Sequence, residues 1–460
     1  MKGLEASEVW LSELEYSGRI DAEYYKPYFL RYESIIKRRS ATLSSISNFL
    51  IGPFGSAFTV DNYVESKEYR YIRGKDVKPL RLMDDDNVYI SQKDFERLSR
   101  YALKENDILV SVVGTIGNAA IISKKDLPAI FSCKSTVLRP FSIEPKYLAV
   151  YLNTKYGKSL LQRKERGAIQ KGLNLDDLKN LDIYIPDYSI QTFVKNLYDT
   201  ALFRQGQSQA LYRQAEELLL EALGLKDFEP SRENKSVKTF KASFLTTGRL
   251  DAEYYQPKYE EIENKIKRLP YELIGSICSD ITYGTVPTSP YTENGEGIPY
   301  IKGMNLKNLR VMGDLDRITN TDELPDKFYT ETGDIVISQM GTVGDVGIIT
   351  EKERGYLFAS FTIRIRIKDK KMFNPYYVGL YIQNIAKEWY LLRNIAQASV
   401  RQNTDLPTIR NMYIPLVETE IQRRIAALIK KSFALRRESE RLLDEAKGAV
   451  EREIEGGAMT

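Results

Sequence analysis

A chain of 460 residues is longer than one hydrophobic core usually supports, so its length indicates two or more domains. Its residues are 42% hydrophobic and 28% charged, which is typical of a folded soluble protein, and no apolar run reaches the roughly eighteen residues that a membrane span needs. Histidine is absent, which excludes catalytic and metal sites built on that residue, whereas a net charge of +4 permits nucleic-acid binding without requiring it.

The chain starts with MKGLEASEVW, which carries acidic residues and no apolar segment. No signal peptide is therefore expected, and the cytoplasm is the predicted location. The two cysteines, Cys133 and Cys278, do not occupy equivalent positions in the two halves of the chain. They predict neither a disulfide framework nor a zinc site, and we interpret both as packing residues.

The sequence repeats itself. GRIDAEYYKP (18–27) returns as GRLDAEYYQP (248–257), with eight of the ten residues identical. Three further pairs follow in the same order: YIRGKDVK (71–78) with YIKGMNLK (300–307), NDILVSVVGTIGNAAII (106–122) with GDIVISQMGTVGDVGII (333–349), and NLDDLKNLDIYIP (174–186) with NTDLPTIRNMYIP (403–415). The paired segments lie 227 to 230 residues apart, which indicates a tandem duplication of two whole domains.

Each copy contains the same predicted elements. DILVSVVG and DIVISQMG predict strands, because their β-branched and apolar residues run up to a glycine, and GTIGNAAII and GTVGDVGII predict a tight turn with a returning strand. STVLRP and FTIRIRI indicate a further strand, with one face of the second exposed to water. EPKYLAVYLNT (144–154) and NPYYVGLYIQN (374–384) predict helices that begin at proline, and each copy closes on an extended YIP.

A different period follows each YIP. Mostly apolar or small residues alternate spacings of four and three over positions 190–222 and again over 421–449. This predicts two coiled-coil seams, with Arg204 as a polar break that could fix the register. An amphipathic helix packed on its own domain is the alternative, but two seams in one chain favour pairing. Paired antiparallel, the helices would hold the domains apart on a rod of roughly 50 Å.

The ordered set of paired segments, each set followed by a long helix, resembles the DNA-specificity (S) subunit of type I restriction–modification systems over essentially the whole chain. IGPFGSAF (51–58), the paired YIRGKDVK and DILVSVVG segments, the YIP closings and the heptad helices carry the resemblance. It implies an α+β chain: two tandem mixed α/β target-recognition domains, separated by two long antiparallel coiled-coil helices with pseudo-two-fold symmetry.

The expected division follows from that resemblance. Residues 1–187 would form an N-terminal segment and the first target-recognition domain, and 188–226 the central spacer helix. Residues 227–417 would form a linker and the second target-recognition domain, and 418–460 the C-terminal spacer helix.

The resemblance also implies a function and partners. Each domain would read one half of a bipartite site in double-stranded DNA, and the helices would set the gap between the halves. The chain would be non-catalytic, without cofactor or metal, and would assemble with two DNA adenine methyltransferase subunits and with restriction and translocase subunits. No membrane partner is expected.

Candidate DNA contacts lie in loops of both copies. GPFGSAFT (52–59) is bracketed by glycines, so its backbone could approach DNA closely, and the turns after YIR and YIK carry basic residues. ERGAIQKG (165–172) and QASVRQN (397–403) combine glutamine with a basic residue, and glutamine and arginine form favoured bidentate pairs with adenine and guanine. The predicted contacts are Ser56, Arg70, Arg73, Lys75, Arg166, Gln170, Lys171, Tyr283, Thr285, Lys302, Lys307, Gln339, Arg401 and Gln402.

Enzyme readings have little support. NPYY (374–377) lacks the second proline of the NPPY-type adenine methyltransferase motif, and its first-half counterpart is EPKY (144–147). GTIG and GTVG lack the spacing of a phosphate-binding loop, and DDD (84–86) is interpreted as a solvated turn. The remaining alternative is a two-headed protein-interaction scaffold on a coiled coil that binds no nucleic acid.

Overall fold

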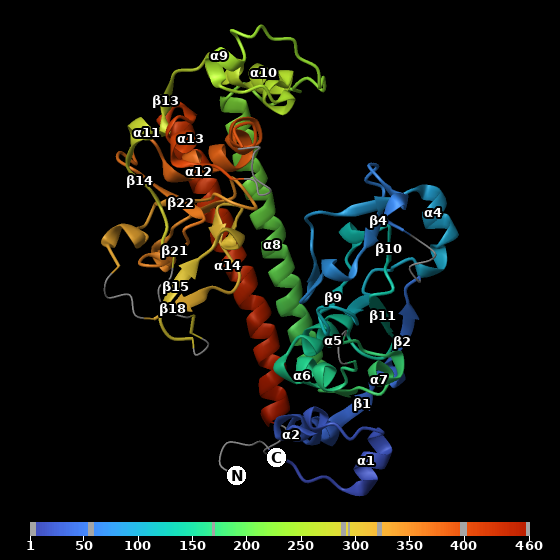
Figure 1. The fold of residues 1–460 in the computed structure, drawn as a ribbon. Coiled ribbons are helices and arrows are strands. Elements are labelled where there is room, and N and C mark those ends of the chain that lie inside the picture. The colour runs from blue at the N-terminus through green and yellow to red at the C-terminus, as the bar shows by residue number, and fades with distance from the viewer. Residues whose placement is uncertain are drawn as a thin grey trace. The chain divides into compact units, whose positions relative to one another are not determined.

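The computed structural model describes residues 6–53, 59–167, 171–286, 291–292, 295–319, 324–395 and 403–456. The chain forms two compact units (Figure 1). Unit 1 comprises residues 1–205 and 437–460, and unit 2 comprises residues 206–436. Each of the two longest helices is therefore shared: its sequence passes from one unit to the other near its middle.

Two four-stranded sheets organise unit 1. The first has the order β2-β11-β8-β9 and is antiparallel throughout, and the second has the order β10-β4-β7-β3 with β10 and β4 parallel. Two short pairs, β1-β12 and β5-β6, complete it. The strands are β1 Ser40–Thr42, β2 Ser47–Ile51, β3 Tyr63–Val64, β4 Tyr69–Ile72, β5 Val77–Lys78, β6 Arg81–Leu82, β7 Val88–Ile90, β8 Ile108–Ser111, β9 Ala119–Ile121, β10 Ala129–Phe131, β11 Ser135–Pro140 and β12 Asp182–Tyr184.

The helices of unit 1 start at residues that suit helix N-termini. Pro27 and Pro145 occupy the first turn of α2 and α5, and the side chain of Asn174 accepts the Asp177 N–H at the start of α7. The helices are α1 Leu11–Ser17, α2 Pro27–Ile36, α3 Leu43–Ile46, α4 Gln92–Arg97, α5 Pro145–Leu152, α6 Lys155–Arg163, α7 Leu175–Lys179 and the long α8 Tyr188–Ala222, which continues into unit 2.

Unit 2 repeats this plan. Its main sheet has the antiparallel order β14-β22-β19-β20, and its second sheet has the order β18-β15-β21 with β15 and β21 parallel. The pairs β13-β23 and β16-β17 match the short pairs of unit 1. The strands are β13 Tyr271–Leu273, β14 Cys278–Tyr283, β15 Ile298–Ile301, β16 Leu306–Lys307, β17 Arg310–Val311, β18 Asp316–Ile318, β19 Ile335–Ser338, β20 Val346–Ile348, β21 Leu357–Phe358, β22 Thr362–Ile367 and β23 Tyr413–Pro415.

The helices of unit 2 are α9 Phe244–Thr247, α10 Pro257–Ile266, α11 Ile274–Ile277, α12 Pro375–Tyr381, α13 Leu406–Arg410 and the long α14 Thr419–Gly456, which continues into unit 1. The predicted strands and proline-started helices are thus present in both copies. The helix expected over 374–384 changes character along its length, because α12 gives way to a π-helix, η12 Ile382–Leu391. Two mixed α/β units confirm the predicted fold class.

The core of each unit lies on its main sheet. Residues 108–110 of β8 and 335–337 of β19 are fully buried, as the runs DILVS and DIVIS predict. One acid is buried beside each strand. Asp107 accepts two hydrogen bonds from Arg139, and Asp334 accepts two from Arg366, all four at 2.8 Å. Each carboxylate also accepts one backbone N–H, so both are well paired despite their burial.

Both cysteines have free thiols. Cys278 packs within the hydrophobic cluster of unit 2, and burial raises the pKa of its thiol to about 12. Cys133 is half-buried. The side chain of Cys278 is therefore a packing group, as predicted, and its thiol stays protonated at neutral pH.

The long helices pair along their heptad seams. In unit 1, Arg204 Nε lies 3.1 Å from Glu438 Oε1, and in unit 2, Ser208 Oγ lies 3.0 Å from Ser432 Oγ. From Arg204 to Ser208 the residue numbers rise along α8, while those of their partners on α14 fall from Glu438 to Ser432. The helices are therefore antiparallel (Figure 1, green and red). Alternate seam positions are buried, at 194, 201, 208 and 215 on α8 and at 425, 432, 439 and 446 on α14. The predicted coiled-coil pairing is confirmed.

The carboxylate of Glu216, on α8 in unit 2, is partly buried, which destabilises its charged form. Burial raises the pKa of Glu216 on α8, although Asn384 donates to it at 2.6 Å. A raised folded-state pKa contributes stability that is complete below the unfolded pKa and is lost as the pH rises through the folded pKa. We therefore expect Glu216→Gln to raise the melting temperature at pH 8 and to leave it nearly unchanged at pH 4. Calorimetry at both pH values tests this, and an equal shift at both would contradict it.

Candidate functional site

In each unit, several of the candidate loops start from the same region of the structure. Gly52, just after β2, packs against Ser132, where an added Cβ would lie 2.6 Å from the carbonyl carbon. Gly284, just after β14, packs in the same way against the carbonyl oxygens of Phe358 and Ala359. We call residues 132–134 and 359–361, which lead into β11 and β22, the junction segments. A glycine is needed at both sites, because no side chain fits between the crossing backbones.

We expect Gly284→Ala to lower the free energy of unfolding of unit 2 by about 3 kcal/mol, because the new Cβ forces backbone apart. Gly206→Ala is the matched control: it lies on α8 with nothing within 4 Å of an added Cβ, and should stabilise by roughly 0.5–1 kcal/mol. Urea unfolding of the two variants measures both effects. Equal effects would show that the crossing is not tight.

Two further segments meet the junction segment of unit 1. An added Cβ on Gly74, in the YIRGK turn, would lie 2.9 Å from Lys134 Cβ. Val112 N donates to Lys134 O at 3.0 Å, and Leu173 N donates to Val112 O at 2.9 Å. The turn after β4, the end of β8 and the end of the 165–172 loop therefore converge on residues 132–134.

Unit 2 repeats the convergence with its own residues. Gln339 N donates to Phe361 O at 3.0 Å, and Thr404 N donates to Gln339 O at 3.1 Å. Tyr283 lies beside them, since its hydroxyl accepts the Leu406 N–H at 3.2 Å. Thr285 is buried beside the junction segment: its N–H donates to Phe358 O at 2.9 Å, and its carbonyl accepts the Ser360 N–H at 3.0 Å. The structure thus brings together three predicted residues, Tyr283, Thr285 and Gln339, from two segments of the chain.

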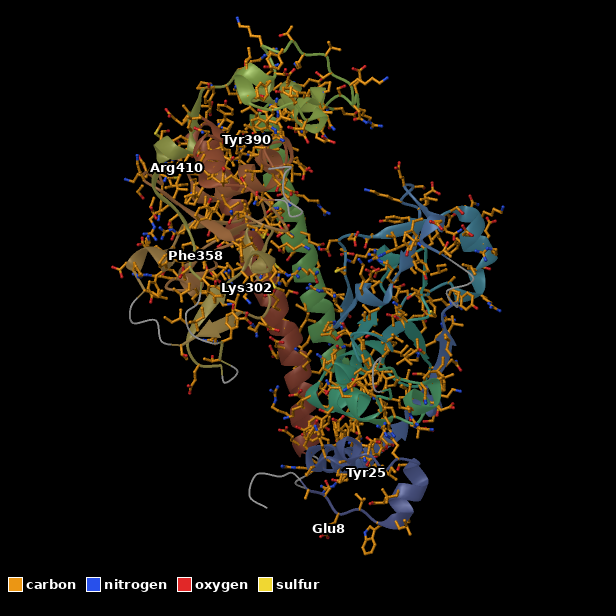
Figure 2. All side chains as sticks on the ribbon, viewed as in Figure 1. Glu8, Tyr25, Lys302, Phe358, Tyr390 and Arg410 are labelled. Atoms are coloured by element: carbon orange, nitrogen blue, oxygen red, sulfur yellow. The ribbon has the colours of Figure 1, made fainter. Side chains whose placement is uncertain are left out.

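The two YIxGx turns carry basic side chains that already have acidic neighbours. Arg73 donates to both oxygens of Asp76, at 3.0 and 2.9 Å, and Lys75 lies 2.8 Å from Asp86 while remaining exposed. In unit 2, Lys302 (Figure 2) pairs with Asp316 and lies 4.4 Å from the centre of the Tyr291 ring. The carboxylate of Asp316 raises the pKa of the Lys302 ammonium, so this side chain is charged at neutral pH. Lys307 is exposed on β16.

The 165–172 loop of unit 1 is closed at its base. Arg166 and Gly172 exchange two backbone hydrogen bonds, of 2.9 and 2.8 Å. The Arg166 guanidinium donates to both oxygens of Asp177, at 2.5 and 2.9 Å, and Lys171 lies 3.4 Å from Glu165. Arg166 and Lys171 are both exposed, and each is paired with a carboxylate at this closed base.

Arg70 lies elsewhere. Its side chain is buried beneath β4, 3.3 Å from the buried carboxylate of Asp126, and it also donates to the Met83 carbonyl. Such an arginine serves packing inside unit 1, because its charge is already matched away from solvent. Ser56, Gln170, Arg401 and Gln402 lie outside the described residues, so their predicted contacts stay predictions.

Three residues at the convergence were missed in the sequence. Lys134 is exposed on the junction segment of unit 1, and Phe361, its counterpart 227 residues later, is 55% exposed in unit 2. Met304, in the YIKGM turn, is 84% exposed. The duplication itself was the available signal: an exposed lysine and an exposed phenylalanine stand at one position of two copies.

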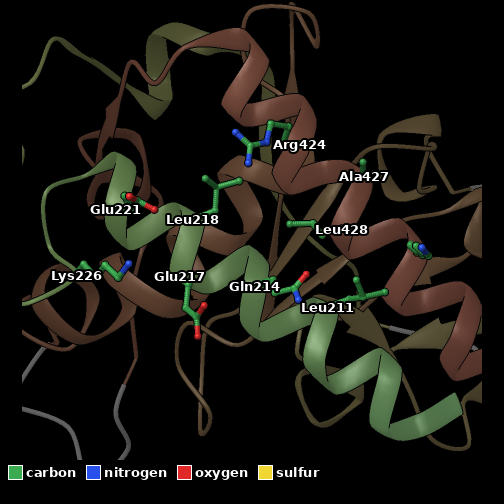
Figure 3. Close-up of a pocket in the computed structure, with 10 residues that line it drawn as sticks. Leu211, Gln214, Glu217, Leu218, Glu221, Lys226, Arg424, Ala427 and Leu428 are labelled. Atoms are coloured by element: carbon green, nitrogen blue, oxygen red, sulfur yellow. The ribbon is translucent and has the colours of Figure 1, made fainter. Parts of the chain in front are cut away.

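Grooves lie on each unit. A polar groove of about 410 Å³ in unit 1 is lined by the GRIDAEYYK segment and by residues 162–167 and Lys171. Another, of about 510 Å³, lies between α8 and α14 in unit 2, where Figure 3 shows Leu218 and Leu428 with Glu217, Glu221 and Arg424 around them. The second groove mixes leucine side chains with charges of both signs, unlike a phosphate-binding surface.

The described residues contain neither a membrane-spanning helix nor a metal-binding cluster. No helix there is long and apolar enough to cross a membrane. No group of three or more cysteine, aspartate or glutamate side chains in the same ranges could hold a metal ion.

Two mixed α/β units, each with its share of an antiparallel helix pair and with a convergence of loops at one junction segment, define a two-domain protein that arose by tandem duplication. Comparison with protein families matches residues 51–205 and 274–445 to the type I restriction modification DNA specificity domain. Because these matches cover most of the chain, the protein belongs to this family of restriction–modification specificity proteins, with two such domains in tandem.

Solved structures of this kind are similar to the chain, although distantly. The S subunit of a type I restriction-modification system from M. genitalium shares 14% identity with a TM-score of 0.42, covering 90% of this chain and 93% of that one. The HsdS subunit from Thermoanaerobacter tengcongensis shares 16% identity with a TM-score of 0.30, covering 91% and 97%. A search of curated proteins found no match. The family assignment rests on the sequence match alone.

Proposed function

We propose that this chain is the sequence-specific DNA-recognition subunit of a type I restriction–modification complex. Each domain reads one half of a bipartite target in double-stranded DNA, and the paired helices set the gap between the halves. The chain itself carries out no catalysis. It positions two DNA adenine methyltransferase subunits and the restriction and translocase subunits, in the cytoplasm.

The observation that carries the proposal is the duplicated convergence of loops. In each unit, a glycine crossing, a YIxGx turn, the end of a buried strand and a loop base meet at one junction segment. The scaffold around this place is the same in both units, while the exposed residues differ, with Lys134 in one and Phe361 in the other. Two readers of two different half-sites need this combination of a shared frame and distinct side chains.

The exposed side chains suggest separate roles. We assign phosphate contacts to Lys75, Lys134, Lys171 and Lys307, whose ammonium groups lie on the surface. We assign base-edge contacts to the loops that leave the junction segments and to Phe361, since an exposed aromatic ring can meet a thymine methyl group. Arg70 is left out of this set, because its charge is used inside unit 1.

A pair of equivalent substitutions tests these roles. Lys134→Ala should weaken binding to all sequences and reduce the slope of log K against log salt by about 0.9, as expected for one lost phosphate contact. Phe361→Ala should leave that slope unchanged and lower discrimination at the second half-site about tenfold. Fluorescence anisotropy over a salt series measures both. The reverse outcome, with the slope changed by Phe361→Ala only, would contradict the assignment.

The whole proposal is tested in two experiments. Methylome sequencing of a host with and without this protein should reveal a bipartite motif, methylated on adenine in each half, that appears only with the protein. A gel shift with the methyltransferase partner should show DNA binding, and the chain purified alone should show no methylation or ATP hydrolysis. Partner binding without any DNA binding would favour the interaction scaffold instead.

A further inference from the structure

The repeated GR(I/L)DAEYY motif makes the same contacts in both units. In unit 1, Arg19 donates to both oxygens of Asp21, at 2.7 and 2.9 Å. In unit 2, Arg249 donates to both oxygens of Asp251, at 2.7 and 2.6 Å. The following Tyr25, labelled in Figure 2, and Tyr255 each donate from the hydroxyl to the carbonyl of the motif arginine at 3.0 Å. These hydrogen bonds lie within the motif itself, in both units.

A second arginine contacts the motif, from the last residue of α6 in unit 1 and from two residues after η12 in unit 2. The guanidiniums of Arg19 and Arg163 both lie over the Tyr24 ring, 4.6 and 4.2 Å from its centre. Those of Arg249 and Arg393 lie over the Tyr254 ring, 4.6 and 4.4 Å from its centre. We call this arrangement the double-arginine clamp. Two guanidiniums contact one tyrosine ring in each unit, which holds the motif against the segment that leads into the loop.

The second arginine has a backbone and an acidic partner of its own. Arg163 Nε donates to Tyr24 O at 2.8 Å, and its Nη1 lies 2.7 Å from Glu33 on α2. Arg393 Nε donates to Tyr254 O at 3.0 Å, and its Nη1 lies 2.7 Å from Glu263 on α10. Both guanidiniums are largely buried, so each clamp is a built structure inside its unit.

The remaining side of the motif arginine reaches the start of the loop. Arg19 Nη1 donates to the carbonyls of Arg163 and Glu165, at 3.4 and 3.0 Å. Arg249 donates to the carbonyl of Ile395 through both Nη1 and Nη2, at 3.3 Å. These carbonyls stand where the chain leaves α6 and η12 toward the 165–172 and 397–403 loops. The far ends of the loops are tied to 112–113 and 339–340. The motif arginine thus holds the near end.

We propose that Arg19 and Arg249 are positioning residues for DNA recognition, each of which fixes the near end of the loop that we assign to base contacts in its own unit. The inference rests on the proposed function and gives the motif a reason to occur twice. A lysine cannot replace the arginine, since one ammonium cannot span the carboxylate, the carbonyl and the ring face together. Each arginine should therefore control recognition of one half-site only.

Hydrogen exchange of the full chain tests the positioning without DNA. Arg19→Lys should speed exchange of the Arg166 and Gly172 amides about tenfold, because their mutual hydrogen bonds lose the anchored end, and should leave the Thr404 amide unchanged. Arg249→Lys should leave Arg166 and Gly172 unchanged and speed Thr404. Arg97→Ala, which removes an exposed charge from α4, is the control and should change none of them. Unchanged exchange in both lysine variants would overturn the proposal.

Binding by the complex with the methyltransferase tests the specificity. Competition with duplexes scrambled in one half should show that Arg19→Lys lowers discrimination about tenfold at the first half-site only, and Arg249→Lys at the second only. The salt slope should stay unchanged, since neither arginine contacts a phosphate. Equal loss at both half-sites, or a slope reduced by about 0.9, would overturn the inference. A wild-type complex without any half-site preference would instead defeat the proposed function, while the exchange result still decides whether the arginines position the loops.

Discussion

Inserting one heptad into both long helices should lengthen the recognised gap by about three base pairs and leave the half-sites unchanged. Seven helical residues add roughly 10 Å, and one base pair spans about 3.4 Å of duplex. The insertions belong after Gln205 and after Arg436, where the chain passes between the units, so that contacts within each unit are retained. Modification of the original target should fall on the order of 100-fold or more, because one half-site loses its base contacts.

Two controls separate spacing from damage. A heptad inserted into α8 alone leaves α14 short and should abolish recognition of both gaps. A four-residue insertion into both helices interrupts the heptad repeat and unwinds the pair locally, and should lower the melting temperature as well. Methylome sequencing reads the gap directly. An unchanged gap in the double-heptad variant would show that something other than the helix pair sets the spacing.

Asp334→Ala should lower the free energy of unfolding of unit 2 by about 3–5 kcal/mol, the largest stability effect expected of one substitution here. The carboxylate is fully buried and accepts two hydrogen bonds from Arg366 and one from the Glu331 N–H, all at 2.8 Å. Arg364, also buried, lies 3.8 Å away. Without the carboxylate, two arginines on β22 keep their charge beside a cavity.

Asp107→Ala should have a similar effect on unit 1, because Asp107 holds Arg139 in the same geometry. Asp94→Ala is the surface control: its partner Arg97, 2.8 Å away, is exposed, and loss of such a pair should cost under about 1 kcal/mol. Hydrogen exchange resolves the stability of each unit separately. If all three variants were destabilised equally, burial would not be the reason for the large effect.

Much of the fold could be predicted because the chain is a duplication. Most strands and helices appear in two sequences, so the buried run of β8 is supported by the run of β19, and the heptad seam of α8 by that of α14. The change from α12 to a π-helix after Tyr381 could not be predicted, since the pattern of apolar residues does not distinguish adjacent helix types. Nor does any local pattern show that residues 437–456 complete the first unit.

The candidate site was predicted less well, for a physical reason. Composition shows that Arg70 is basic, but its burial depends on Asp126, which is 56 residues away along the chain. Lys134 was not predicted, because in the sequence it is a single charge between two strands. In the structure its backbone carbonyl accepts the Val112 N–H just after β8. The double-arginine clamp joins Tyr24 to Arg163, 139 residues apart. The repeated GR(I/L)DAEYY motif was therefore visible in the sequence, but the arginine that contacts it was not.

Unit 1 is assembled from two stretches of chain that are separated by all of unit 2. Ala446, Val450 and Ile454 of α14 lie in the same core as Val194 and Tyr198, and Glu455 pairs with Lys155 at 2.6 Å. A ribosome therefore delivers every residue of unit 2 before it delivers these last parts of unit 1. The unit that is translated first is the one that finishes folding last, so its nascent apolar surface stays uncovered for the longest part of synthesis.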